Sequence, residues 1–189
     1  MARPEGKAPA HARSLLGAFQ GLGRILQRIP RAMAATGFFA WLAVIWFVSS
    51  RPAPSLERGG PFDEILANLA HAPEYGVLVL WLALALPRRD GWPSLGARAV
   101  TGILLVAVLY AVLDEYHQSF TPHRDASAFD VLTDFVGASG TLSCIVTTGG
   151  PRASSQELLK RLVLGFFACI LAASLATFGP DAWPDAAWL

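Results

Sequence analysis

Long runs of uncharged, hydrophobic residues alternate along this chain with short segments that carry most of its charge. The clearest run lies between Arg31 and Arg51, where 19 consecutive residues are uncharged and rich in phenylalanine, tryptophan, valine and isoleucine. A helix needs about 17–25 residues of this kind to cross the hydrocarbon core of a membrane. Similar runs cover approximately residues 68–86, 99–113, 134–148 and 162–178. The pattern predicts an all-α polytopic membrane bundle of five transmembrane helices, or of four if the run 134–148, which small polar residues dilute, does not cross.

A helical periodicity also precedes the first run. Apolar side chains recur there at steps of three and four, at Leu15, Phe19, Leu22, Leu26 and Ile29. The arginines in this segment fall away from that stripe, so the spacing predicts an amphipathic helix on the membrane surface, with its arginines near anionic head groups. A secretory signal peptide is the competing interpretation. It is disfavoured because the first run lies far from the N-terminus and has no small-residue cleavage site.

Lysine and arginine are distributed unevenly among the segments that connect the runs. The N-terminal segment and the second and fourth loops hold 12 of them, whereas the other loops and the C-terminal tail hold 3. Positive charge is retained on the cytoplasmic side, so we expect a cytoplasmic N-terminus and an extracytoplasmic C-terminus. The predicted organisation is a disordered tail with a cytoplasmic amphipathic helix over residues 1–31, a membrane domain over 32–180 and an extracytoplasmic tail over 181–189.

Composition supports a membrane protein and excludes some partners. Charged residues make up 15% of the chain and hydrophobic residues 53%, whereas soluble domains carry about 25% charged residues. The net charge of +1 argues against a nucleic-acid partner and leaves membrane lipids as the expected surroundings. Cys144 and Cys169 fall inside predicted spans without metal-binding spacing, so both are interpreted as small hydrophobic residues.

Polar clusters interrupt the apolar pattern where predicted spans begin or end. Pro73 suits the first turn of the second span, so its neighbours lie near that helix start. Because successive spans run in opposite directions, the clusters should meet at the extracytoplasmic surface, with Arg124 as the nearby cation. Ionisable groups at membrane depth are costly and are usually retained for function or paired with one another. The candidate residues are His71, Glu74, Tyr75, Asp114, Glu115, Gln118, Arg124, Asp130 and Asp134. His117, His123 and Asp125 are expected to be solvated loop residues.

Three chemical interpretations of these clusters remain open. In the first, Glu115, Asp114, His71 and Asp130 bind a divalent metal such as magnesium, manganese or zinc. In the second, Glu74 or Glu115 performs acid–base chemistry with His71 while Arg124 grips a phosphate or carboxylate. In the third, Arg124 and His71 neutralise the carboxylates and lock the helices together. No strict metal-binding motif decides among them.

The polar residues form three ordered motifs: His71-x-x-Glu74-Tyr75-x-x-Leu78, then Asp114-Glu115-x-x-Gln118-x-Phe120-x-Pro122-x-Arg124, then Ser127-x-x-Asp130 followed by Gly137. In this order they resemble the VanZ-like family of small bacterial membrane proteins, over approximately residues 68–140. The resemblance implies a protein of the bacterial cytoplasmic membrane, connected with glycopeptide resistance of the teicoplanin type or with homeostasis of the cell envelope. The chain departs from the family pattern at His123, where glycine is frequent, and at Asp134, where asparagine is frequent.

Two classes of function fit these observations, and they leave open whether the protein is an enzyme. In one, an outward-facing site binds or modifies a lipid or amphiphile of the cell envelope. Its candidate catalytic residues are Glu115, His71, Glu74 and Asp114, and its candidate ligand-binding residues are Arg124, Gln118, Tyr75, Asp130 and Asp134. In the other, a non-enzymatic membrane module acts through an unidentified protein partner. A proton-coupled transporter ranks last, because the clusters lie at one surface and no inverted repeat is visible.

Overall fold

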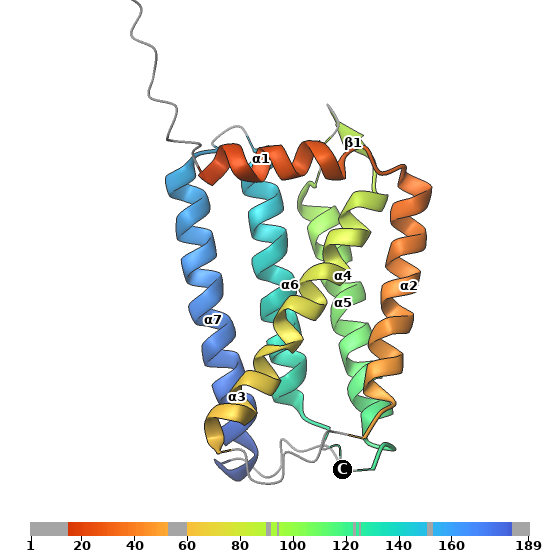
Figure 1. The fold of residues 1–189 in the computed structure, drawn as a ribbon, viewed down its shortest axis with the longest axis vertical. Coiled ribbons are helices and arrows are strands. Elements are labelled where there is room, and N and C mark those ends of the chain that lie inside the picture. The colour runs from red at the N-terminus through yellow and green to blue at the C-terminus, as the bar shows by residue number, and fades with distance from the viewer. Residues whose placement is uncertain are drawn as a thin grey trace, which may run out of the picture.

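The computed structural model describes residues 15–52, 60–89, 92–93, 95–122, 124, 126–150 and 153–182. Its elements in chain order are α1 (Leu15–Leu26), α2 (Arg31–Ser49), α3 (Pro61–Leu69), α4 (His71–Ala85), β1 (Arg88–Arg89), β2 (Trp92–Pro93), α5 (Ala97–Gln118), α6 (Ala128–Gly149) and α7 (Ser155–Ala182). The two short strands pair antiparallel as a hairpin beyond the end of α4. Helices α2, α4, α5, α6 and α7 run side by side as one bundle, while α1 lies across one end of it (Figure 1).

Five segments of the described chain are long and apolar enough to cross a membrane, which confirms the prediction of five spans. They are Arg31–Ser49, Pro61–Ala85, Ala97–Gln118, Ala128–Gly149 and Ser155–Gly179. The outer surface of the bundle carries large apolar side chains, with Leu105, Leu164 and Phe167 each more than half exposed. Such a surface suits hydrocarbon as its surroundings, because water would leave this area uncompensated. The fold is therefore that of a multi-pass membrane protein.

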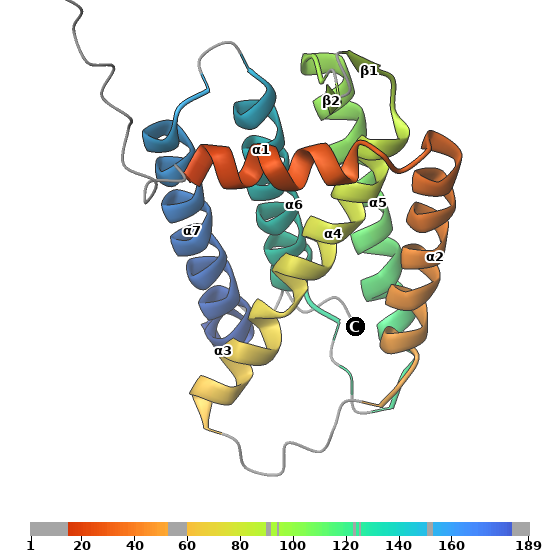
Figure 2. The ribbon, with the colours of Figure 1, turned by 45° about the horizontal axis from the view of Figure 1, so that its top comes forward.

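The amphipathic N-terminal helix is confirmed as α1, although it ends at Leu26 and not at Ile29. Pro30 occupies the N-cap of α2, so the chain turns there before the next helix begins. Arg88 holds the turn in place, because its Nη1 donates to the Gln27 carbonyl oxygen at 2.7 Å. Figure 2 shows α1 running across the ends of α7, α6 and α4. The disordered tail expected over residues 1–12 lies outside the described residues.

The second span differs from its prediction, because it consists of two helices. Pro61 occupies the first turn of α3, a position that requires no backbone N–H and suits proline. Ala70 separates α3 from α4, and α4 then crosses the bundle obliquely, as Figure 1 shows. The sequence analysis did not predict α3, since its two acidic residues shorten the apolar run. Pro73 lies in the first turn of α4, as predicted.

Helix α4 forms the centre of the bundle and packs most closely against α6. Gly137 permits this approach, because a Cβ atom at that position would clash with the backbone of Ala72. The surrounding core is apolar and includes Tyr75, Leu78 and Leu142, each almost fully buried. This tight crossing fixes the start of α4 relative to the start of α6, where the polar residues gather.

Candidate functional site

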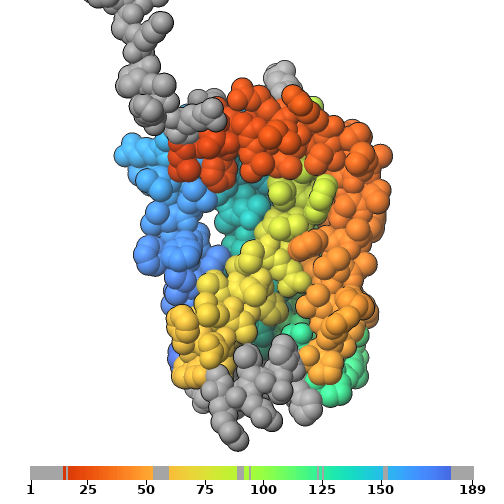
Figure 3. All heavy atoms as spheres, in the orientation of Figure 1, coloured from red at the N-terminus to blue at the C-terminus, as the bar shows by residue number. Residues whose placement is uncertain are grey.

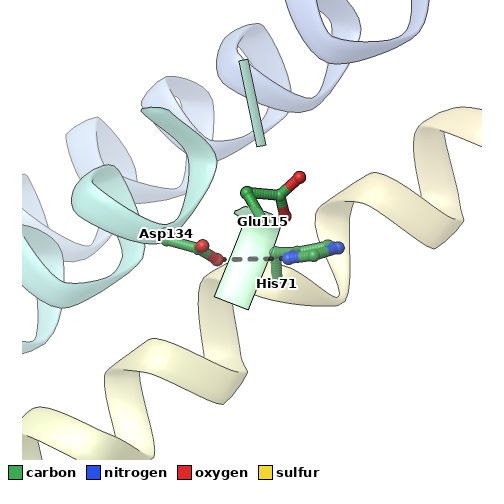
Figure 4. Close-up of side chains that lie close together, drawn as sticks. All are labelled: His71, Glu115 and Asp134. Atoms are coloured by element: carbon green, nitrogen blue, oxygen red, sulfur yellow. Dashed lines mark hydrogen bonds and ion pairs between the residues drawn. The ribbon is translucent and has the colours of Figure 1, made fainter. Parts of the chain in front are cut away.

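The break between α3 and α4 determines where the first polar side chain lies. His71 is the first residue of α4, and the Nδ1 edge of its ring faces Asp134 of α6 (Figure 4). There His71 Nδ1 lies 3.2 Å from Asp134 Oδ1, which makes an ion pair when the imidazole is protonated. Asp134 is nearly two turns into α6, and Gly137 on the same helix faces Ala72 of α4. The close α4–α6 crossing therefore holds this histidine and this carboxylate together.

Glu115 of α5 completes a group of three side chains from three helices (Figure 4). One ligand atom from each of His71, Glu115 and Asp134 lies within 4.8 Å of the other two. The two carboxylates are each only 1% exposed, and the imidazole is 16% exposed. A nitrogen and two carboxylate oxygens at this separation can share a proton or coordinate a cation.

The last turn of α5 is buried and holds its acidic groups through several hydrogen bonds. Gln118 Nε2 donates to Glu115 Oε1 at 3.1 Å and to Asp114 Oδ2 at 2.9 Å. Ser49 Oγ, at the end of α2, donates to the same Asp114 oxygen at 2.8 Å. The backbone N–H of Ser127, which caps α6, donates to Glu115 Oε2 at 2.9 Å. These polar residues extend α5 beyond the apolar run 99–113 and form a buried last turn that ends at Gln118.

Arg124 lies beside this network but does not neutralise it directly. Its Nε and Nη2 donate to the carbonyl oxygens of Arg51 and Val48, at 3.2 and 3.3 Å, and its Nη1 lies 3.4 Å from Gln118 Oε1. It forms no ion pair with a carboxylate among the residues that the structure describes. His71, in contrast, lies within ion-pair distance of Asp134, so the interpretation in which these two cations neutralise the carboxylates stays a prediction. Arg124 itself holds its loop against the end of α2 through these two carbonyl oxygens.

Several buried oxygen atoms of the site have no hydrogen-bond partner among the described residues. They are Asp134 Oδ2, Asp114 Oδ1, Asp130 Oδ1 and the hydroxyl of Tyr75. A buried polar atom left without a partner costs about 1–3 kcal/mol, and more when it is charged. Few described basic side chains lie near these oxygen atoms, His71 and Arg124 among them. The arrangement therefore favours a proton, a cation or a polar ligand group over a closed internal network.

The remaining predicted residues belong to the same end of the bundle. Glu74 is half-buried one turn beyond His71, and its backbone carbonyl accepts a hydrogen bond from Trp41 Nε1 at 2.9 Å. Asp130 lies in the first turn of α6, as expected. The expectation for His117 is wrong, since it lies in α5 and its ring stacks on Trp46 with a centroid distance of 3.8 Å. His123 and Asp125 lie outside the described residues.

An apolar cavity of about 660 Å³ borders the site. It lies between α6 and α7, with α1 across one end and the α3–α4 junction at the other. Figure 3 shows the hollow between α7 and α6, just below α1. Its lining is almost entirely apolar and includes Leu22, Leu69, Ala72, Cys144, Phe166 and Cys169. The cavity therefore connects the region beside His71 with the surface helix α1.

Comparison with protein families matches residues 12–147 to the family described as VanZ/LLP1. The chain belongs to the VanZ/LLP1 family. The matched region contains all nine candidate residues but ends before α7, so the helix that forms one wall of the cavity lies outside it. Comparison with curated proteins and with solved structures found no match.

Sequence analysis missed two residues that support the site in this VanZ/LLP1 protein. Ser49 ends the first span and holds Asp114, although nothing in the sequence connects positions 65 residues apart. Trp41 lies within the first apolar run, and its indole N–H holds the start of α4 by donating to the Glu74 carbonyl oxygen. A polar residue in the last turn of an apolar span is the only available signal for Ser49. For Trp41 the sequence offers none.

Proposed function

We propose that this VanZ/LLP1 protein binds a lipid or lipid-anchored amphiphile of the bacterial cell envelope. The polar head lies at the cluster around His71, Glu115 and Asp134, and the hydrocarbon chain lies in the apolar cavity. One observation carries the proposal. Ala70, Ala72 and Pro73 line the cavity, while His71, in the same short segment, faces the polar cluster. A single molecule with a charged head and an apolar tail matches that pair of environments.

The distribution of charge supports an outward-facing head-group site. Basic residues lie at the end of the bundle that α1 covers, including Arg24, Arg31, Arg88 and Arg161. The opposite end holds the acidic cluster, with Arg51 and Arg124 as its described basic residues. By the positive-inside rule, the α1 end faces the cytoplasm of the bacterial inner membrane. The polar site then meets amphiphiles in the outer leaflet or outside the membrane.

The residues of the polar site have different roles in binding the head group. Arg124 offers a planar guanidinium at the rim, where a ligand phosphate or carboxylate can exchange for the Gln118 oxygen it contacts at 3.4 Å. His71, oriented by Asp134, is the group best placed to donate or accept a proton at the head group. Tyr75, Asp130, Glu74 and Asp114 complete the polar wall.

This function gives a physical route to glycopeptide tolerance. Teicoplanin carries a fatty chain on a polar glycopeptide, and lipid-linked wall precursors have a similar amphiphilic form. A protein that captures such molecules alters their availability at the membrane surface. We expect the wild type, but not Glu115→Gln, to raise several-fold the concentration of teicoplanin that a susceptible host tolerates. Equal tolerance from both, at equal expression, would point instead to action through a protein partner.

Native mass spectrometry of the detergent-purified protein tests the binding itself. Cys169→Phe places a bulky ring in the cavity and narrows it, because Cys169 lines it on α7. Leu171→Phe is the matched control, since Leu171 lies on the same helix and is 63% exposed. We expect a bound lipid in the wild type and in the control, and at least a tenfold smaller bound fraction in Cys169→Phe and Arg124→Ala. Equal occupancy in all four folded proteins, or none in the wild type, would reject the proposal.

A further inference from the structure

We propose that His71, Glu115 and Asp134 bind one divalent transition-metal ion, of the zinc or manganese type. The inference deepens the proposed function, because the ion lies where the head group of the amphiphile is placed. It concerns three side chains from α4, α5 and α6 (Figure 4).

The separation of the ligand atoms suits one ion. An ion bonded at about 2.0–2.2 Å to each ligand keeps any two of them within about 4.4 Å. The three atoms already lie within 4.8 Å of one another. Small side-chain rotations, without movement of the helices, therefore complete the coordination. Asp134 and His71 exchange their direct contact of 3.2 Å for a shared bond to the cation.

A second observation, independent of the spacing, also indicates a cation. Asp134 is 1% exposed, and its Oδ2 has no hydrogen-bond partner among the described residues. Its carboxylate points towards His71 and Glu115 in Figure 4. Arg124 does not compensate this charge, since its donors go to backbone carbonyls and to Gln118. Buried carboxylates require such compensation, and a bound cation provides it.

Hydrogen bonds orient Glu115, the third proposed ligand, as is usual for the ligands of metal sites. Gln118 Nε2 donates to one Glu115 oxygen and the Ser127 N–H to the other. Each carboxylate oxygen keeps a further lone pair for a cation. Such supporting hydrogen bonds orient a ligand and typically alter metal affinity 10–100-fold when removed.

The donor set selects the class of ion. One imidazole nitrogen with two carboxylates suits zinc or manganese, whereas magnesium and calcium favour sites made of oxygen alone. A site with three protein ligands leaves a coordination position open. A phosphate or carboxylate oxygen of the amphiphile fits that position.

The test measures metal binding separately from lipid binding. Protein stripped with a chelator is titrated with Zn²⁺ or Mn²⁺, and bound metal is counted by native mass spectrometry alongside the shift in melting temperature. Asp134→Asn and Glu115→Gln keep the shape of each side chain, and Glu157→Gln is a control because that residue pairs with Arg161 on α7. We expect one equivalent in the wild type and the control, with a melting temperature that rises with metal concentration. Affinity should fall at least tenfold in the other two variants.

Two outcomes would overturn the metal site: no stoichiometric metal in the folded wild type, or undiminished affinity in both ligand variants. Melting without metal separates misfolding from lost ligation, because a variant that still unfolds cooperatively in the absence of metal is folded and has lost only a ligand. If the chelator-treated wild type retains lipid but binds no metal, the amphiphile site stands and the metal site is rejected. If the wild type binds metal but no lipid, the metal site stands and the amphiphile site is rejected.

Discussion

Substitution of Gly137 by alanine tests the packing that brings the candidate site together. A Cβ atom on Gly137 would lie 2.6 Å from the carbonyl carbon of Ala72, whereas ordinary contacts of a Cβ begin at 3.4 Å. The atoms it meets are backbone atoms, so no side chain can rotate away. Helices α4 and α6 must therefore separate by about 1 Å, and overpacking of this kind typically costs 1–3 kcal/mol, occasionally more. The same shift lengthens the His71–Asp134 contact, which lies one turn away.

Gly102→Ala is the matched control, because Gly102 lies within α5 with no atom within 4 Å of its virtual Cβ. Alanine should stabilise that exposed helical position by about 0.5–1 kcal/mol. We expect thermal unfolding in detergent to place Gly137→Ala well below the wild type and Gly102→Ala at or above it. A Gly137→Ala protein as stable as the control, with unchanged lipid binding, would refute the argument that this glycine positions the site.

Three further substitutions test individual contacts. Ser49→Ala removes a donor to buried Asp114 and should lower the free energy of unfolding by about 1–3 kcal/mol, measured in a denaturant or thermal series; an unchanged value would show that the hydroxyl contributes nothing. Arg124→Lys loses the planar guanidinium group that contacts two carbonyl oxygens and Gln118. Backbone amides after α5 should therefore exchange hydrogen at least tenfold faster. Unchanged exchange would contradict this role of Arg124. The Trp92 ring packs against Gly23 of α1, and its Nε1 donates to the Ile145 carbonyl oxygen at 3.0 Å. Trp92→Phe removes that hydrogen bond and should therefore speed hydrogen exchange selectively in α1. Uniform changes along the chain would argue against docking of α1 by this ring.

The lengths of the apolar runs, and their alternation with short charged segments, were sufficient to predict the architecture. Each apolar run identified a span because a lipid-facing helix must be apolar over its whole crossing. The juxtaposition of His71 with Glu115 and Asp134 was also predictable in outline, since consecutive spans alternate in direction. The sequence could therefore place these residues at one end of the bundle.

Helix ends and individual partners could not be predicted, because they depend on packing between helices. Gln118 and its acidic neighbours were expected at the outer end of a span, but their partners Ser49 and Ser127 come from other helices and could not be read from the sequence. Arg124 suggests an ion pair, whereas carbonyl oxygens at the end of α2 occupy its donors. The cavity depends on how far α7 stands from α6, a distance that no sequence pattern reports.

Photo-crosslinking with a bifunctional lipid tests the central claim most directly. A phospholipid with a diazirine beside its head group should label the α3–α4 junction, around residues 70–73, while a diazirine at the end of the chain should label α1 and the cavity face of α6, including Leu22 and Cys144. Cys169→Phe should suppress both patterns, and Leu171→Phe should preserve them. Labelling confined to outward-facing residues such as Leu105 and Leu164, or the reverse order of the two labels, would contradict a head group at the polar cluster with its chain in the cavity.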